Sequence, residues 1–342
     1  MGRSPCGSVS LARSILEHTF DKGRVMARQE QLQLLALCAL EGVTGAQWQA
    51  IARQARQPGG LDALLAGRVT ERGVTASKLQ SALDEQMDSL PASLEWVEQA
   101  TASALESGAR LVTVLDEAYP VNLRRVSNLP PFLFVEGTLT ESDAVALAVV
   151  GTRGASERGL QQARKMSQLL AERGVTVVSG LAAGIDTAAH EAALESGGRT
   201  IAVMGTGILR TYPRENLTLR QRIREHGAVI SQFWPDQPPG RHSFPIRNVV
   251  TSGISQGTVV IEASHTSGAR NQARRAWEHG KEVFLLQSLV TDEKWAQTFI
   301  EQGRAIEVAS SDDVAAIIDR LQTPRDVYEG TELREQLALE LT

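Results

Sequence analysis

The chain has 342 residues, of which 42% are hydrophobic and only 4% aromatic. This composition is typical of a folded protein with an aliphatic core, and the length suits two modest domains or one domain with an extension. The net charge of −5 excludes a globally basic nucleic-acid-binding protein. Any binding of nucleic acid must therefore rely on a local basic patch.

The first residues and the cysteines constrain the location of the protein. We expect residues 1–28 to form a disordered tail, because they contain no continuous apolar stretch of the signal-peptide type. No apolar run in the chain approaches the roughly 20 residues that a membrane helix needs. Cys6 and Cys38 have the spacing of neither a metal site nor a disulfide framework. We therefore expect a cytoplasmic protein without a metal, a cofactor or a membrane span.

Residues 29–107 are predicted to form a helical domain. The segment 31–41 is rich in strong helix formers, and Gly42 and Gly45 interrupt it. Ser93 is expected to cap a further helix over 94–107. The helix–glycine–helix pattern suits a small SAM-like module, and a plain helical packing domain explains it equally well.

Residues 108–322 are predicted to form an α/β domain. Two short strands, 110–115 and 132–135, lead into a series in which each apolar strand is followed by a loop and, in most cases, a helix. The predicted strands of this series are 144–150, 175–179, 200–204, 228–233, 258–263, 282–286 and 305–308. The predicted helices are 157–173, 185–196, 217–226, 269–279 and 312–321. Uninterrupted apolar strands of this kind predict a Rossmann-like parallel sheet covered on both faces, and residues 323–342 are expected to form a C-terminal tail.

Glycine-bearing loops follow four of the predicted strands, at 151–154, 179–184, 205–207 and 264–268. In open parallel sheets, ligands bind beyond the carboxyl ends of the strands. Glycine lets the backbone approach a ligand closely, and helix N-termini offer N–H donors to anions. Neither the G-x-G-x-x-G fingerprint nor a Walker sequence is present. The loops therefore predict an anion site without a dinucleotide or ATP.

Basic residues lie beside these loops. Residues 241–281 hold six positive side chains against two negative ones, a local excess of +4; the charged residues are Arg241, Arg247, Arg270, Arg274, Arg275, Lys281, Glu262 and Glu278. Arg153 directly follows an apolar strand, which places it at the ligand rim. Arg247 and Asn248 are expected in a loop that opens a helix, where they can hold phosphates. Phe244 either stacks on a base or fills the core.

Two features bear on catalysis. Asp186 and His190 are four residues apart and share a helix face, for which we favour a structural role at the helix start. Glu262 closes a buried strand, and a catalytic role there is the less favoured alternative. None of the predicted strands is followed by a nucleophile elbow, and the sequence contains no H-E-x-x-H pattern. We therefore predict a binding protein that is not an enzyme.

Residues 178–190, VSGLAAGIDTAAH, resemble the signature of the DprA/Smf family. Residues 148–153, 198–207, 244–248 and 260–263 resemble further family segments in the same order, as do Tyr212-Pro213 and Asn216, and the similarity covers about residues 30–290. The resemblance implies an extended Rossmann fold, a homodimer, and binding of single-stranded DNA. It also implies protection of incoming or exposed DNA and loading of the RecA recombinase in recombination or natural transformation.

By position, the resemblance assigns DNA-backbone contacts to three arginines, 153, 199 and 247, and a close-approach loop to residues 179, 180 and 184. Arg199 precedes a strand, so strand direction alone puts it at the opposite end of the sheet from Arg153. The resemblance nevertheless makes Arg199 a candidate DNA contact, and we expect all three guanidinium groups on one face. The complete predicted DNA-binding set is Arg153, Ser179, Gly180, Gly184, Arg199, Phe244, Arg247, Asn248, Ser267, Gly268 and Arg270.

The chain departs from the family pattern in three places. Val249 replaces an arginine, Gln256 replaces an aspartate, and residues 269–273 (ARNQA) replace the apolar SLITA, which adds charge to that helix start. Two alternative functions follow from other features. Residues 255–262 keep the Gly-Thr and Glu of the LOG-type nucleotide phosphoribohydrolases but lack their PGG, and the arginines near 270 suit a small-nucleotide sensor.

Overall fold

The structure is a computed structural model that describes residues 28–331. The chain divides into two compact units between Glu98 and Gln99. This division lies within helix α5 (Leu90–Glu106), upstream of the boundary expected at 107/108.

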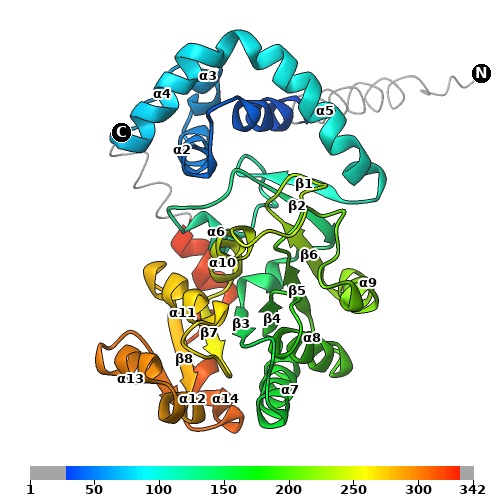
Figure 1. The fold of residues 1–342 in the computed structure, drawn as a ribbon, viewed down its shortest axis with the longest axis vertical. Coiled ribbons are helices and arrows are strands. Elements are labelled where there is room, and N and C mark those ends of the chain that lie inside the picture. The colour runs from blue at the N-terminus through cyan, green and yellow to red at the C-terminus, as the bar shows by residue number, and fades with distance from the viewer. Residues whose placement is uncertain (1–27, 332–342) are drawn as a thin grey trace, which may run out of the picture. The chain divides into compact units, whose positions relative to one another are not determined.

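Helices make up the described part of the first unit (Figure 1). Residues 28–39 are helical and are followed by α2 (Gly45–Ala55), α3 (Gly60–Leu65), α4 (Val74–Gln86) and α5. Gly45 begins α2 where the sequence suggested a break, because Thr44 and Gln47 form a capping box at its N-terminus. Ser93 lies inside α5 and does not cap it. The helix starts earlier because Pro91 in its first turn needs no N–H partner.

The second unit is built on one mixed sheet with the order β1-β2-β6-β5-β4-β3-β7-β8-β9 among the described residues. Strands β1, β2 and β6 pair antiparallel, whereas all pairs from β6 to β9 are parallel. The strands are β1 (Arg110–Thr113), β2 (Phe132–Gly137), β3 (Ala146–Val150), β4 (Thr176–Ser179), β5 (Thr200–Val203), β6 (Ala228–Ser231), β7 (Gly257–Val260), β8 (Glu282–Leu286) and β9 (Ile306–Val308). This is the predicted Rossmann-like α/β architecture.

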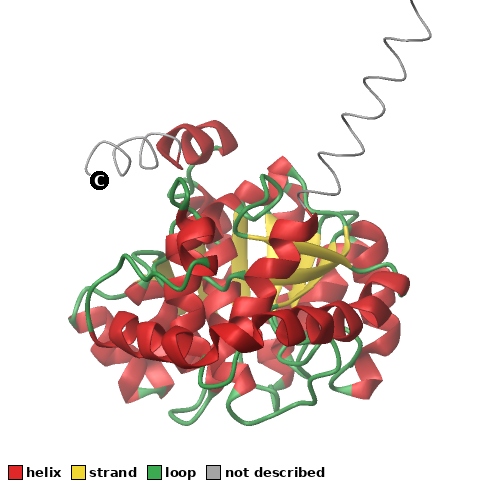
Figure 2. Ribbon diagram, turned by 90° about the horizontal axis from the view of Figure 1, so that it is seen from above, coloured by secondary structure: helices red, strands yellow, loops and turns green. Residues whose placement is uncertain are grey.

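Helices cover both faces of this sheet, as the view from above shows (Figure 2). Helices α7 and α8 pack together, and so do α10 and α11. The helices of the unit are α6 (Val121–Arg124), α7 (Glu157–Glu172), α8 (Ile185–Glu195), α9 (Leu217–His226), α10 (Ser243–Ile254), α11 (Gly268–Glu278), α12 (Gln287–Asp292), α13 (Lys294–Glu301) and α14 (Val314–Ile318). The order of strands and helices agrees with the prediction except for α6, α12 and α13, which were not predicted, and α10, for which only the opening of a helix was expected.

The core of the second unit is aliphatic, as the low aromatic content requires. All five residues of β3 are buried, and Leu147 and Val149 belong to a buried cluster that includes Met166 of α7 and Ile185 of α8. Each fully buried side chain of this kind contributes roughly 1.5–3 kcal/mol. The sheet is therefore a rigid base on which the loops at its carboxyl edge are held.

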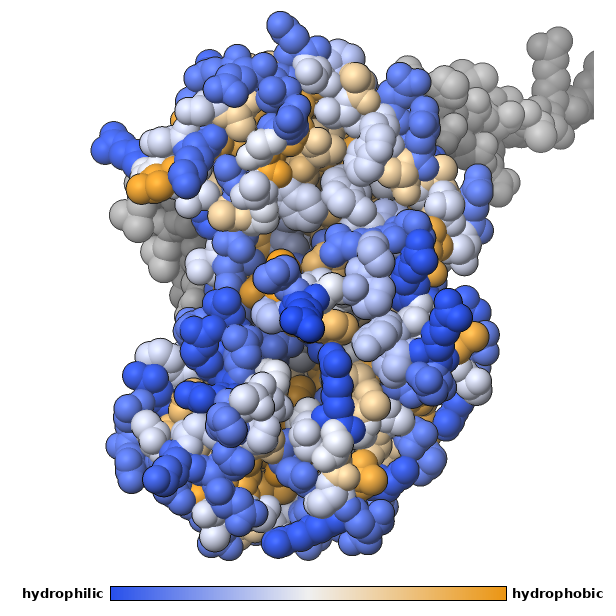
Figure 3. All heavy atoms as spheres, viewed as in Figure 1, coloured by the Kyte–Doolittle hydropathy of each residue, from blue (hydrophilic) through white to orange (hydrophobic). Residues whose placement is uncertain are grey.

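The surface carries little continuous apolar area on the face shown in Figure 3, where hydrophobic side chains form small separate groups in a mainly hydrophilic surface. Within residues 28–331, no helix combines the length and the apolar character needed to span a bilayer.

Candidate nucleic-acid interface

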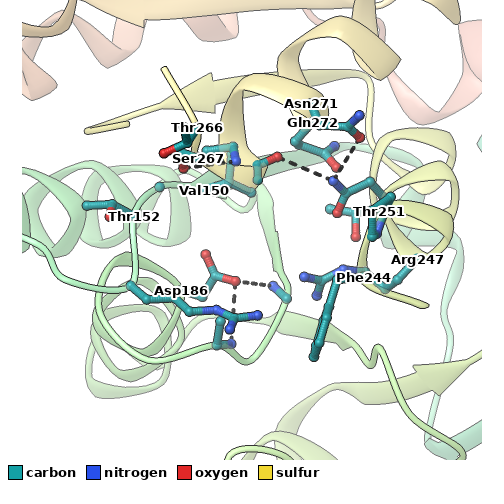
Figure 4. Close-up of a pocket in the computed structure, with 18 of the residues that line it drawn as sticks. Val150, Thr152, Asp186, Phe244, Arg247, Thr251, Thr266, Ser267, Asn271 and Gln272 are labelled. Carbon is teal, nitrogen blue, oxygen red and sulfur yellow. Dashed lines mark hydrogen bonds between the residues drawn. The ribbon is translucent and has the colours of Figure 1, made fainter. Parts of the chain in front are cut away.

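A pocket of 390 Å³ lies beyond the carboxyl ends of the parallel strands. Loops after β3, β4 and β7 and the first turns of α10 and α11 form its walls (Figure 4). Of the predicted set, the residues that line it are Arg153, Gly180, Phe244, Arg247, Asn248, Ser267 and Gly268. Three of the four glycine loops therefore converge as expected, and the loop at 205–207 lies behind Phe244 instead.

One wall of the pocket pairs a cation with an aromatic ring. The Arg153 side chain is exposed, and its guanidinium carbon lies 4.7 Å from the centroid of the Phe244 ring. Tyr212, which is 43% exposed, places its ring 5.7 Å from Phe244. An exposed guanidinium beside two partly open rings offers a stacking surface and a phosphate partner in one place.

Phe244 and its neighbours begin helix α10, which starts at Ser243. Arg247 and Asn248 were predicted in a loop that opens a helix, whereas both lie within α10. Pro245 is compatible with the first turn, because the first N–H groups of a helix have no partner within it. Ser243 Oγ donates to the Gly205 carbonyl at 2.5 Å, which joins the start of α10 to the loop after β5. The helix start is thus anchored to the sheet edge.

Arg247 forms the floor of the pocket and is buried, with 8% exposed. Its Nη1 donates to the Val203 carbonyl at 2.6 Å, and the guanidinium rests on Gly180, where an added Cβ would lie 1.9 Å from Nη1. Burial lowers the pKa of Arg247, and the charge of Asp186 opposes that change. Because Arg247 is buried and held in place, its main contribution is a positive electrostatic potential at the floor of the pocket. A direct contact of its guanidinium with a phosphate is the smaller contribution.

Asp186 lies opposite Arg247 at the start of α8 (Figure 4). Its carboxylate accepts from the backbone N–H groups of Gly180 at 3.1 Å and Ala182 at 3.4 Å. Burial raises the pKa of Asp186, whereas the Arg247 charge and these hydrogen bonds lower it. Asp186 thus shapes the loop after β4, in line with the structural role favoured from the sequence.

The remaining predicted residues near the pocket have structural contacts. Ser179 is buried, and its Oγ donates to the Val149 carbonyl of the next strand at 2.7 Å. Gly184 has φ +80°, and an added Cβ would lie about 2.5 Å from the Arg153 carbonyl oxygen. Ser267 caps α11 by accepting from the Ala269 N–H. Each of these residues positions a wall of the pocket.

Arg199 does not join the pocket. It immediately precedes β5 and lies at the amino ends of the parallel strands. There its Nε contacts Asp143 Oδ1 at 2.7 Å, and its Nη2 contacts Asp143 Oδ2 at 2.9 Å. The expectation that the guanidinium groups of 153, 199 and 247 share one face is therefore corrected. The direction of the parallel strand separates Arg199 from the other two.

Arg270 lies at the rim and not in the pocket lining. Its side chain is exposed, and its Nη1 donates to the His265 carbonyl at 3.2 Å. Asn248, in contrast, lies inside the lining, where its Nδ2 donates to the Gly268 carbonyl at 3.4 Å. No sequence pattern indicated that Thr251, Asn271 and Gln272, which lie within helices, would line the pocket.

The groups considered for catalysis are engaged elsewhere. His190 is fully buried; its Nδ1 lies 2.7 Å from Thr200 Oγ1, and burial lowers its pKa to about 3. Glu262 accepts from Ser156 Oγ at 2.6 Å and so supports the N-terminus of α7. Among residues 28–331, no group of three His, Cys, Asp or Glu side chains is arranged to hold a metal ion.

The fold and the pocket define a Rossmann-like protein with a ligand site at the carboxyl edge of its sheet. Residues 110–319 match the family model of the DNA recombination-mediator protein A. Because this match covers more than half of the chain, the protein belongs to that family.

Two curated relatives illustrate the similarity in sequence. The Escherichia coli protein Smf is 38% identical over 259 residues, which cover 75% of this chain and 65% of the relative. The DNA processing protein DprA of Streptococcus pneumoniae is 38% identical over 206 residues, which cover 60% of this chain and 72% of the relative. The alignment thus spans slightly less than two thirds of the length of Smf.

Two solved structures resemble the fold. The structure of DNA processing protein A from S. pneumoniae matches with a TM-score of 0.67 and 29% identity, over 86% of this chain and 98% of that one. A structure of DNA processing protein A from Helicobacter pylori, described for its single-stranded DNA binding mode, matches with a TM-score of 0.56 and 25% identity, over 62% of this chain and 98% of that one.

Proposed function

We propose that this protein binds single-stranded DNA in the pocket at the carboxyl edge of its sheet, as a mediator of DNA recombination. The observation that carries the proposal is the exposed guanidinium of Arg153 over the Phe244 ring, 4.7 Å away, at a pocket that Arg247 underlies. Membership of the recombination-mediator family and the DNA-binding H. pylori relative support the same function.

The aromatic wall favours a single strand over a duplex. In a duplex the flat faces of the bases are stacked inside and cannot reach a protein ring, whereas an unpaired base can stack on Phe244 or Tyr212. The volume of 390 Å³ falls within the range of small-ligand pockets, which suits a base with its sugar. Arg153 then lies beside the adjoining phosphate.

We propose binding without turnover. Asp186, which lines the pocket, and Glu262, which follows β7, each accept two or more hydrogen bonds from the protein. A phosphoribohydrolase needs a carboxylate free to act on the ribose, and Glu262 is directed to Ser156 instead. Action in the cytoplasm, a homodimer and assistance of RecA loading are parts of the proposal that follow from the family resemblance.

The proposal is tested by fluorescence anisotropy with a labelled oligothymidylate of 15 nucleotides (the 15-mer) at two salt concentrations. Unlabelled single- and double-stranded DNA serve as competitors. We expect Arg153→Ala to weaken binding about tenfold, for a loss of about 1.4 kcal/mol, and to reduce the salt slope by about 0.7 for one lost phosphate contact. Arg173→Ala removes the same charge next to β4 at the opposite edge and should stay within twofold of wild type.

Two results would count against the proposal. Equal competition by duplex and single strand removes the argument from the aromatic wall, and an Arg153→Ala protein that binds like wild type removes the argument from the cation. The alternative functions are checked in the same preparation. Release of free base from AMP favours a nucleotide hydrolase, and tight binding of AMP without DNA binding favours a nucleotide sensor.

The recombination role needs a separate assay, because DNA binding alone does not demonstrate it. RecA filament formation on single-stranded DNA that carries a single-strand-binding protein is measured with and without this protein. We expect the wild-type protein to shorten the lag before filament growth and Arg153→Ala to lose that effect. An unchanged lag with the wild-type protein would contradict the mediator role while leaving DNA binding intact.

A further inference from the structure

The outer face of helix α11 is basic and aromatic. Arg270, Arg274 and Trp277 are spaced i, i+4 and i+7, so they lie on one side of the helix. The inner side is buried through Ala269, Gln272, Ala273 and Ala276. Because the three outer residues take no part in the core, their identity is not explained by packing of α11 on the sheet.

Trp277 pairs with a cation from another part of the chain. Its side chain is 43% exposed, and the guanidinium carbon of Arg304, just after α13, lies 4.5 Å from the centroid of its ring. This is the same kind of pairing as Arg153 with Phe244 in the pocket. An exposed ring beside a cation offers a surface on which a nucleic-acid base can stack.

The charge balance of this face is positive. Glu278 lies 3.7 Å from Arg274 and 2.9 Å from Arg275, so one carboxylate serves two arginines. Four arginines, at 270, 274, 275 and 304, lie on or beside this face, and two of them share the carboxylate of Glu278. An excess of this size attracts phosphates and disfavours an apolar protein partner.

The face is continuous with the pocket. Ser267, Gly268, Ala269 and Asn271, which open α11, line the pocket, and Arg270 is the adjoining residue on the outside of the helix. The seven helical steps from Arg270 to Trp277 span about 10 Å. At the ~3.4 Å spacing of a stacked strand, this length accommodates about three nucleotides.

We propose that Arg270, Arg274, Trp277 and Arg304 form an outer DNA track that holds the nucleotides leaving the pocket. Arg270 and Arg274 contact phosphates, and a base stacks on Trp277. The inference rests on the proposed function of the pocket and extends it. Arg270 belongs to the segment that departs from the apolar family pattern, so the track is a property of this chain and not a general family feature.

The track predicts a dependence on oligonucleotide length. A hexanucleotide fills the pocket alone, whereas a 15-residue oligothymidylate also reaches α11. We expect the double variant Arg270→Ser/Arg274→Ser to bind the 15-mer about tenfold more weakly, with a salt slope lower by about 1.4 for two phosphates, and to bind the hexamer within twofold of wild type. Arg222→Ser/Arg224→Ser removes the same charge from exposed positions on α9 and should leave both affinities within twofold.

Trp277 provides an independent readout. Quenching of tryptophan fluorescence by the 15-mer should fall in Trp277→Phe, while quenching by the hexamer should not change. The conservative replacement keeps a ring in place, and a thermal melt equal to that of wild type confirms that the variant is folded.

Each outcome separates the track from the pocket. If the Arg270→Ser/Arg274→Ser variant loses affinity for the hexanucleotide and the 15-mer to the same extent, or for neither, the outer track is overturned. A wild-type protein that binds neither oligonucleotide overturns the proposed function itself. A lower molar mass by light scattering in the arginine variant, with unchanged DNA binding, assigns the face to contact between copies of the chain and also overturns the track.

Discussion

Gly205 controls the position of the aromatic ring in the pocket wall. An added Cβ at Gly205 would lie 2.6 Å from Cδ1 and 2.8 Å from Cε1 of Phe244, and its three nearest atoms all belong to that ring. Ordinary contact requires at least about 3.4 Å, so in Gly205→Ala the ring must move by about 1 Å. The movement changes the position of the ring relative to Arg153, whose guanidinium carbon lies 4.7 Å from the ring centroid.

The expected cost follows from the role of the ring. Removal of a base-stacking aromatic weakens binding by about 1–3 kcal/mol, which corresponds to roughly 5- to 150-fold in Kd. Phe244→Ala should show this loss in full, and Gly205→Ala should show a large part of it. The double variant should bind like Phe244→Ala alone, because without the ring the methyl group added at position 205 has no neighbour to displace.

The assay is a double-mutant cycle by fluorescence anisotropy with the 15-residue oligothymidylate. Strong non-additivity between the two substitutions is the expected signature of their direct contact. Gly330→Ala is the matched control, because nothing lies within 4 Å of its added Cβ and Gly330 does not line the pocket. Additive losses, or a Gly205→Ala protein that binds like wild type, would refute the view that the ring position determines affinity.

Three further predictions concern stability and are measured by urea unfolding. The pKa of His190 falls to about 3 on folding, so between pH 7 and 5 only the unfolded chain takes up the proton. The free energy of unfolding therefore falls by about 2 kcal/mol from this group. His190→Gln should lose this part of the pH dependence, and an equal change of the free energy of unfolding with pH in wild type and variant would contradict the prediction. Ser156→Ala removes the α7 cap, whose Oγ accepts from Gly159 N–H, and should cost about 1 kcal/mol at constant m-value. Arg220→Ala leaves Glu136 buried without its ion-pair partner at 2.6 Å and should cost about 3–5 kcal/mol; a loss below about 1 kcal/mol would show that water reaches the pair.

The parallel sheet was predictable because most of its strands are continuous apolar runs and glycine-bearing loops follow four of them. Where the prediction and the structure differ, proline or amphipathic spacing is the cause. The helices predicted to begin at 94 and after Asn248 begin earlier, at Leu90 and Ser243. Pro91 and Pro245 each stand in the first turn of these helices, where a missing N–H costs nothing. Helix α13 buries only Trp295, Ala296 and Phe299, a pattern too short to distinguish from a loop.

The candidate site was predictable in location more than in detail. Strand direction correctly predicted Arg153 at the ligand edge and Arg199 at the opposite edge. For Arg199 the family resemblance then replaced this correct prediction with an incorrect one. The burial of Arg247 depends on the Val203 carbonyl, which is 44 residues away in the chain, and no local pattern carries that information. The same holds for Tyr212, whose ring meets Phe244 only after the sheet has folded.

The pocket walls rest on places where the backbone has no side chain. Gly184 and Gly205 do not line the pocket, yet the Arg153 carbonyl and the Phe244 ring lie directly against them. One extra carbon atom at either position alters the binding surface without changing any charge or ring in it. When related sequences are compared to judge which of them keep this binding surface, alanine at these two positions is therefore more informative than many exchanges among the polar residues of the lining.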